Sequence, residues 1–177
     1  MMNLIQDLDF NGFRYINKFV NENILIDRLM IFFAEYAQYI FILLFMILWV
    51  KNKYKNRTYV FQALLACCLA FAFNRFIGLL FYRERPFVSH LNINQLVEHT
   101  ANASFPSDHA TSAFAIAITL YMYKKRLGRV FLLLAAFISF SRIWVGVHYP
   151  LDVLIGAILG ILWALISHYI IQTKIKK

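Results

Sequence analysis

Three short groups of residues in this chain carry the side chains that phosphoryl transfer requires. They are Arg85–Pro86, then Pro106–Ser107–Asp108–His109, and then Ser141–Arg142 with His148 and Asp152. A guanidinium fork matches the oxygens of a phosphate, and an imidazole can act as nucleophile or general acid. These residue types predict a phosphoryl-transfer site that works without a metal.

His148 and Asp152 are four residues apart, so on a helix both side chains project from one face. A carboxylate that accepts the proton of one imidazole nitrogen leaves the other nitrogen nucleophilic. The alternative is a helix-opening pair, in which Asp152 only favours the positive end of the helix. His109 follows a proline and a serine at a predicted helix start, where phosphate also binds. We therefore expect His109 to act as a general acid toward a leaving oxygen.

Arg85 and Arg142 are the predicted phosphate clamp. Arg85 alone could equally be an interfacial anchor. Arg142 lies near the end of an apolar run, where a charged residue is by default a functional candidate. Arg75 also lies in an apolar run, beside Asn74, and needs an inward-facing partner, for which Glu35 is a candidate.

A zinc site is the metal alternative, with His109, His148 and Asp152 as its ligands. Two neighbouring arginines would be unfavourable beside a dication, and the sequence offers no further ligand pair at compact spacing. We therefore expect neither a metal nor a cofactor. Cys67 and Cys68 are adjacent in an apolar segment and are interpreted as packing residues.

The elements that must position these groups are predicted to be membrane helices. The chain has 177 residues, of which 61% are hydrophobic, and its long stretches with few charges fit spans of about 20 residues. The sequence predicts an all-α membrane protein: one domain over residues 1–177, with a bundle of about five transmembrane helices between residues 27 and 171. The predicted spans are 27–50, 58–82, 109–123, 129–147 and 150–171.

Residues 1–23 have a different pattern, because apolar and charged side chains alternate along them. This pattern predicts an amphipathic helix that lies in the membrane interface and touches membrane lipids. A soluble arm packed on the spans is the alternative. The segment lacks the basic start, apolar centre and cleavage site of a signal peptide.

The net charge of +9 comes from basic residues that gather in three segments. Eleven of the 18 basic residues lie there: Lys51, Lys53, Lys55, Arg57, Lys124, Lys125, Arg126, Arg129, Lys174, Lys176 and Lys177. With five spans these segments share one side, which the positive-inside rule makes cytoplasmic together with the C-terminus. All three motifs then face outside. The charge needs no nucleic-acid partner.

The three motifs resemble those of the type 2 phosphatidic acid phosphatase superfamily of membrane lipid phosphatases. The pattern of that family is KxxxxxxRP, then PSGH, then SRxxxxxHxxxD. The third motif is complete here, from Ser141 to Asp152. The second has Asp108 in place of glycine, and the first has Gly78 in place of lysine.

The resemblance implies that His148 attacks phosphorus and forms a phosphohistidine. It implies that Asp152 orients the nucleophile, and that His109 protonates the leaving oxygen and then activates water. The implied substrate-binding residues are Arg85, Arg142, Ser107, Asp108 and Ser141. Arg75, or Arg83 from the loop, could replace the missing lysine.

The segment SFPSDHAT and the small size of the chain look most like bacterial undecaprenyl pyrophosphate phosphatases of the bacitracin-resistance type. That likeness implies a multi-pass protein of the bacterial plasma membrane acting outside on a polyprenyl pyrophosphate lipid. Two alternatives remain. One is a phosphatase for phosphatidylglycerol phosphate or phosphatidic acid, and the other is a membrane protein that only binds phosphorylated lipid or the antibiotic.

Overall fold

The computed structural model describes residues 2–51 and 55–175 of the chain, and in these ranges all regular structure is helical. The helices are α1 (Met2–Asn17), α2 (Ile24–Glu35), α3 (Ala37–Lys51), α4 (Lys55–Leu80), α5 (Pro86–Ser89), α6 (Asp108–Tyr123), α7 (Lys125–Trp144) and α8 (Pro150–Ile175). The predicted all-α class is confirmed. Lys53, Lys176 and Lys177, which entered the charge argument, lie outside the described residues.

Within the residues that the structure describes, three helices are long and apolar enough to cross a membrane: Arg57–Leu80, Lys125–Trp144 and Pro150–Thr173. Their mean hydropathies are 2.0, 1.6 and 2.2. The predicted count of about five spans is not confirmed. Helix α6 has only 16 residues, and the region predicted as the first span forms two shorter helices.

The predicted first span, 27–50, is interrupted at Tyr36. Helix α2 begins after Asn23, whose side chain caps it by accepting hydrogen bonds from the amides of Leu25 and Ile26. Helix α2 packs on α7, whereas α3 also reaches α4, so the break lets one apolar stretch serve two neighbours. The stretch contains neither proline nor glycine, and nothing in its composition indicates the break.

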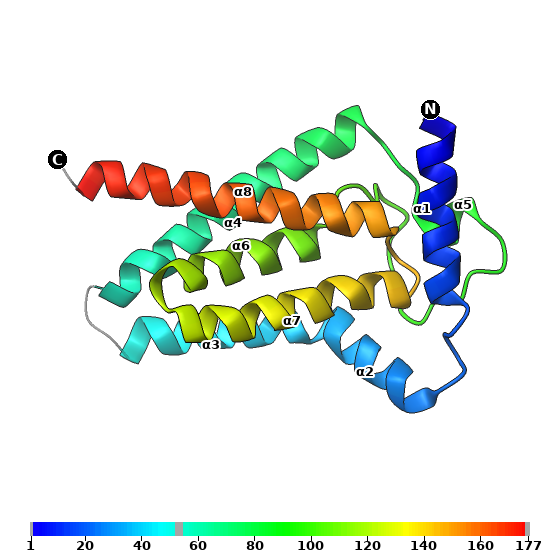
Figure 1. Ribbon diagram of the computed structural model, residues 1–177, viewed down its shortest axis with the longest axis horizontal. Helices are drawn as coiled ribbons and strands as arrows, with labels where there is room; N and C mark the ends of the chain where they lie inside the picture. Colours follow the sequence, from blue (N-terminus) through cyan, green and yellow to red (C-terminus); the bar gives the residue numbers. More distant parts are fainter. Residues whose placement is uncertain (1, 52–54, 176–177) are drawn as a thin grey trace.

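Helix α6 lies in the middle of the bundle and packs on α4, α7 and α8 (Figure 1). Two glycines of α8 allow it to approach α6 closely. A Cβ atom at Gly160 would lie 2.3 Å from the carbonyl oxygen of Thr111, and one at Gly156 would lie 2.7 Å from that of Ser107. The absence of a side chain at Gly156 thus lets α8 lie against the start of α6, where Ser107, Asp108 and His109 follow one another.

Helix α1 crosses the end of the bundle at which α7 ends and α8 begins (Figure 1). Its Phe13 is fully buried and meets Tyr149 edge-on at a centroid distance of 5.7 Å. Asp9 and Asn17 are also buried, whereas Leu4 and Leu8 remain exposed. The segment therefore packs on the bundle as the alternative interpretation expected. That it also contacts lipid stays a prediction.

Candidate active site

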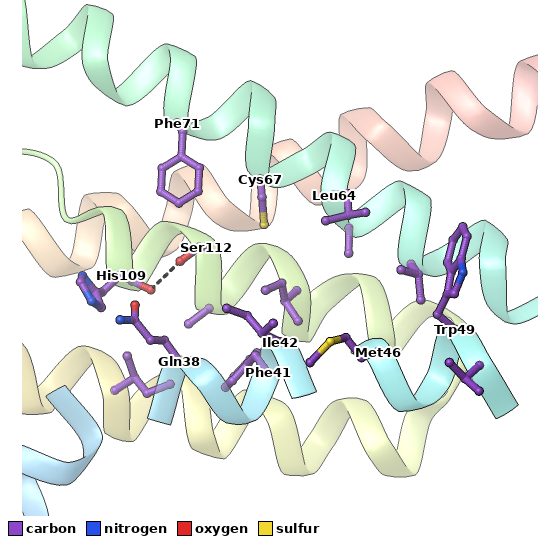
Figure 2. Close-up of a pocket in the computed structure, with 16 residues that line it drawn as sticks. Gln38, Phe41, Ile42, Met46, Trp49, Leu64, Cys67, Phe71, His109 and Ser112 are labelled. Atoms are coloured by element: carbon purple, nitrogen blue, oxygen red, sulfur yellow. Dashed lines mark hydrogen bonds between the residues drawn. The ribbon is translucent and has the colours of Figure 1, made fainter. Parts of the chain in front are cut away.

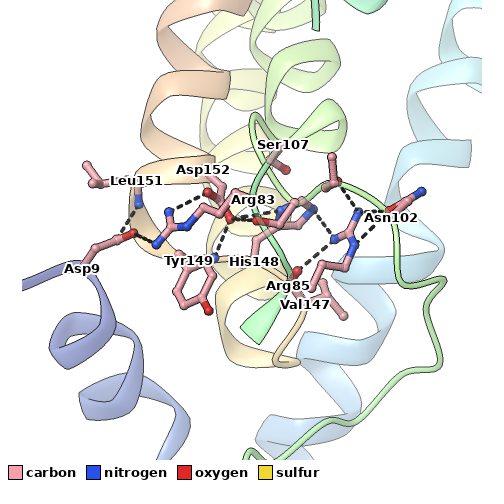
Figure 3. Close-up of polar contacts among 12 residues, drawn as sticks. Asp9, Arg83, Arg85, Asn102, Ser107, Val147, His148, Tyr149, Leu151 and Asp152 are labelled. Carbon is pink, nitrogen blue, oxygen red and sulfur yellow. Dashed lines mark hydrogen bonds and ion pairs between the residues drawn. The ribbon is translucent and has the colours of Figure 1, made fainter. Parts of the chain in front are cut away.

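The polar motifs lie together at the end of the bundle that α1 crosses. Arg85 precedes α5, Ser107 precedes α6, His148 lies in the turn between α7 and α8, and Asp152 is in the first turn of α8. Figure 3 shows these side chains converging from separate elements. A short loop or a helix start carries each one, so the ends of the helices build the site.

His148 is buried, and a different side chain faces each of its ring nitrogens. Its Nδ1 lies 3.6 Å from Oδ2 of Asp152, and its Nε2 lies 3.1 Å from Nη1 of Arg85. A guanidinium can only donate, so Nε2 must accept and the ring proton belongs on Nδ1, facing Asp152. Burial lowers the pKa of His148 to about 4; the charges of Arg85 and Arg142 add to this effect, and Asp152 opposes it. The imidazole is therefore neutral near pH 7, with its lone pair on Nε2.

A tight turn places His148 next to Arg142. The amides of Val147 and His148 both donate to the carbonyl oxygen of Arg142, at 3.2 Å each. The turn contains Gly146 at a φ of +85°, where a Cβ atom would lie 2.6 Å from the carbonyl oxygen of Asn94. Only glycine fits this conformation and this space.

Arg85 is buried and held in place by oxygens of the loop. Its Nε and Nη2 donate to Oδ1 of Asn102 at 3.0 and 2.8 Å, and its Nη1 donates to the carbonyl oxygen of Val147 at 2.9 Å. This guanidinium is thus held beside Nε2 of His148. Such preorganisation is what stabilises charge that develops on a phosphoryl group.

Arg142 is only 3% exposed and is incompletely paired. Its Nη1 donates to the carbonyl oxygen of Ala34 at 2.9 Å, while Nε and Nη2 have no hydrogen-bond partner among the described residues. Helix α2 ends at Glu35, so the Ala34 carbonyl is one of the free carbonyls of a helix end, where the dipole favours a cation. The break at Tyr36 therefore supplies the support for Arg142. Its two unpaired nitrogens are donors that an anionic ligand would satisfy.

His109 lies where three cavities meet. A polar cavity of about 450 Å³ also contains Arg75, Arg85 and His148 in its lining. A cavity of about 290 Å³ adjoins it near His99 and Arg142. The third, of about 640 Å³, is almost entirely apolar and runs between α3, α4 and α6. His109 thus stands between a charged compartment and an apolar one.

The remaining predicted site residues have varied surroundings. Arg75 is exposed and lines the polar cavity, but Glu35 is not its partner, because α2 and α4 make no contact within the described residues. Asp108 lines the same cavity and accepts a hydrogen bond from Asn74 at 2.9 Å, not from an arginine. Ser107 is buried, and in the described part of the chain its hydroxyl has no hydrogen-bond partner. The Ser141 hydroxyl donates to Ile138 at 2.7 Å within its own helix, which leaves it no proton for a substrate oxygen.

Several residues at the site were not predicted from the sequence. Ser104 donates to Oδ2 of Asp152 at 2.8 Å, and Asn102 holds Arg85. Asp9, from α1, contacts Arg83 at 2.7 Å, and Arg83 in turn contacts Asp152 at 2.9 Å. Asn102 and Ser104 lie just before the second motif, so their position in the sequence could have indicated that they belong to the site. Nothing in the sequence indicates that Asp9 does.

The zinc alternative fits the geometry poorly, because Nε2 of His148 already faces the positive Nη1 of Arg85. In the described ranges, no group of three or more His, Cys, Asp or Glu side chains is placed to hold a metal ion. The site contains two arginines, two histidines and the unpaired hydroxyl of Ser107. Such a set of hydrogen-bond donors suits an anionic ligand.

Comparison with known proteins gives one consistent family. Residues 59–176 match the PAP2 superfamily. The chain is 38% identical to the bacitracin transport permease protein BcrC of Bacillus licheniformis, over 90% of this chain and 78% of that protein. It is 34% identical to the undecaprenyl-diphosphatase BcrC of Bacillus subtilis, over 88% and 80%. The crystal structure of Aquifex aeolicus LpxE superposes with a TM-score of 0.80 at 30% identity, covering 92% of this chain and 95% of that one.

Proposed function

This chain belongs to the PAP2 superfamily of membrane phosphatases, and from that premise we propose that it removes the terminal phosphate of undecaprenyl diphosphate at the outer face of a bacterial plasma membrane. The proposed products are inorganic phosphate and undecaprenyl phosphate, a lipid carrier for cell-wall precursors. Recycling that carrier would confer resistance to bacitracin. The observation that carries the proposal is the buried, neutral His148, with Nε2 beside Arg85 and Nδ1 facing Asp152.

The proposed reaction proceeds in two displacements. Nε2 of His148 attacks the terminal phosphorus, and the bond from phosphorus to the bridging oxygen breaks. His109, which takes up a proton when the anionic diphosphate binds beside it, gives that proton to the departing lipid phosphate, and a phosphohistidine remains. His109 then takes a proton from water, whose oxygen attacks the phosphorus, and inorganic phosphate leaves as His148 is restored.

Three groups would stabilise the negative charge on the phosphoryl oxygens in this scheme. Arg85 is already fixed beside Nε2, and the free nitrogens of Arg142 and the free hydroxyl of Ser107 are donors for the equatorial oxygens. Asp152 would stabilise the positive charge that His148 acquires when it is phosphorylated. Arg75, on the wall of the polar cavity, is the proposed replacement for the missing lysine.

The apolar cavity supports a lipid substrate. Figure 2 shows His109 at one end of it and Trp49 at the other, with Phe71, Cys67, Ile42 and Met46 between them. A polyisoprenoid tail lying there would gain favourable burial, while its phosphates would reach the polar cavity on the other side of His109. A soluble phosphate ester has no apolar tail that could fill such a cavity.

The distribution of charge supports the proposed orientation. Helices α4 and α7 begin, and α8 ends, at the end of the bundle remote from α1 and the polar motifs (Figure 1). Arg57, Lys124, Lys125, Arg126 and Arg129 are near that remote end. The positive-inside rule makes it cytoplasmic, so we propose that the site faces outside.

Phosphate release from purified protein tests the proposed function. We expect faster hydrolysis of undecaprenyl diphosphate than of phosphatidic acid or phosphatidylglycerol phosphate, and the same rate in excess chelator. A preference for either glycerolipid would keep the chemistry and reject the substrate. Loss of activity in chelator, restored by zinc or magnesium, would reject the proposed mechanism. No release from any of them would favour the binding-protein alternative.

Substitutions at the two adjacent cysteines test the tail site separately. Cys67 lines the apolar cavity, whereas Cys68 is exposed and does not. We expect Cys67→Trp to raise KM for undecaprenyl diphosphate about 10-fold, because the ring fills space that the tail needs. KM for dimethylallyl diphosphate should stay the same. Cys68→Trp is the matched control, and equal effects of the two substitutions would contradict the assignment.

A further inference from the structure

Arg83 bridges two buried carboxylates at the edge of the site. Its Nη2 lies 2.7 Å from Oδ2 of Asp9, and its Nη1 lies 2.9 Å from Oδ1 of Asp152. The side chains of Asp9 and Asp152 are 1% and 0% exposed, and that of Arg83 is 24% exposed. The guanidinium also lies over the ring of Tyr149, with Cζ 3.7 Å from the ring centroid. Figure 3 shows this row of charged groups leading from α1 to His148.

We propose that Arg83 and Asp9 are positioning residues for the nucleophile, so that α1 forms part of the catalytic machinery. Arg83 holds the carboxylate of Asp152 in the orientation that keeps the His148 proton on Nδ1, and Asp9 holds Arg83. This inference rests on the proposed role of His148. It adds Asp9, which lies outside all three motifs, and Arg83, which stands at a variable position of the first motif.

The contacts of Asp152 show why its orientation depends on Arg83. Oδ2 accepts hydrogen bonds from the Ser104 hydroxyl at 2.8 Å and the Tyr149 amide at 2.9 Å, and it faces His148. Oδ1 accepts a hydrogen bond from Nη1 of Arg83 at 2.9 Å. Without Arg83, a fully buried carboxylate would have one oxygen unpaired and no directly bonded cation. Both consequences favour rotation or protonation of the carboxyl group.

The two carboxylate oxygens of Asp9 have different partners. Its Oδ1 accepts a hydrogen bond from the amide of Leu151 at 2.8 Å, in the first turn of α8, while its Oδ2 meets Arg83. Burial raises the pKa of Asp9, and the Leu151 amide and Arg83 act against that rise. One carboxylate from α1 therefore fixes both the backbone before Asp152 and the cation beside it.

This arrangement also removes Arg83 as a replacement for the missing motif lysine. Both terminal nitrogens of its guanidinium bind carboxylates, and the residue does not line the polar cavity. An arginine suits the bridge better than a lysine because its fork can meet two carboxylates at fixed angles. Lysine would supply the charge but not the geometry.

Steady-state kinetics of four variants test the proposal: Arg83→Gln, Arg83→Lys, Asp9→Asn and the double variant Asp9→Asn/Arg83→Gln. We expect Arg83→Gln to lower kcat about 10- to 100-fold while KM changes less than about 3-fold, because misplacing the nucleophile slows chemistry and leaves the phosphate clamp intact. Arg83→Lys should recover part of the loss. Asp9→Asn should lower kcat about 10-fold, and the double variant should be no slower than Arg83→Gln, because both act through one contact chain.

Matched controls remove charges from the exposed side of α1: Arg14→Gln and Asp7→Asn. Both residues are exposed, and neither joins the chain of contacts, so kcat should be unchanged. Melting curves identify variants that fail to fold. If folded Asp9→Asn and Arg83→Lys both keep the wild-type kcat, or if the double variant is slower by the product of the single effects, the proposal is wrong.

Nitrogen NMR of the histidine rings in substrate-free protein gives a readout independent of turnover, with His148→Gln used for assignment. In the wild type, His148 should be the Nδ1–H tautomer. In Arg83→Gln and Asp9→Asn it should shift toward a mixture of tautomers, whereas Asp7→Asn should match the wild type. An unchanged tautomer in both test variants would overturn the proposal. If the wild type hydrolyses none of the lipids, the proposed function fails, and this measurement still decides the positioning role.

Discussion

Replacing His148 with alanine should lower phosphate release by about 10⁴-fold or more, because the nucleophile of a two-step transfer has no substitute within the site. The effect follows from the position of Nε2 beside Arg85 and from the burial that keeps the ring neutral. The measurement is release of inorganic phosphate from undecaprenyl diphosphate. A base-stable phosphoenzyme should be trapped with the wild type and be absent from the variant.

His168→Gln is the matched control for this substitution. His168 lies on the same helix, α8, and its Nδ1 pairs with Oε1 of Gln62 at 3.1 Å, remote from the polar cavity. Its replacement should leave the rate near the wild-type value. A folded His148→Ala variant that turns over within about 10-fold of the wild type would show that another group attacks phosphorus.

Replacing Arg142 with methionine should reduce kcat/KM about 10²- to 10³-fold and yet leave the free protein at least as resistant to heat. The guanidinium is 3% exposed, and two of its three nitrogens lack a partner, so its burial opposes folding. Methionine has a similar length and no such cost. We therefore expect Arg142 to bind phosphate at a cost in folding stability.

Thermal unfolding in detergent, with and without phosphate or vanadate, tests this prediction. The ligand should raise the melting temperature of the wild type but have little effect on Arg142→Met. Arg129→Met, an exposed position on the same helix, is the control and should keep both activity and ligand response. A variant that melts well below the wild type would show that Arg142 is mainly a structural residue.

The sequence by itself determined the chemistry that is local along the chain. His148 and Asp152 lie close together because only three residues separate them where the turn enters α8, and Ser107, Asp108 and His109 lie together because α6 begins there. The apolar composition determined the helical class, since lipid leaves a backbone few other ways to satisfy its hydrogen bonds. These features depend on neighbours in sequence, which periodicity and spacing record.

Only the tertiary structure decided the partners that come from far along the chain. Asp9 with Arg83, Asn74 with Asp108, and Ala34 with Arg142 are contacts between separate helices and loops. The expected pairing of Arg75 with Glu35 was wrong because α2 packs on α7 rather than on α4.

The physical reason is the same for the spans and for the site. An apolar segment meant for lipid can be apolar on every face, so its sequence does not record which face meets which neighbour, or that it breaks at Tyr36. The sequence set which groups could do chemistry. The packing of helix ends against α1 and α2 decided which of these groups lie together, how they are oriented and which donors lack a partner among the described residues.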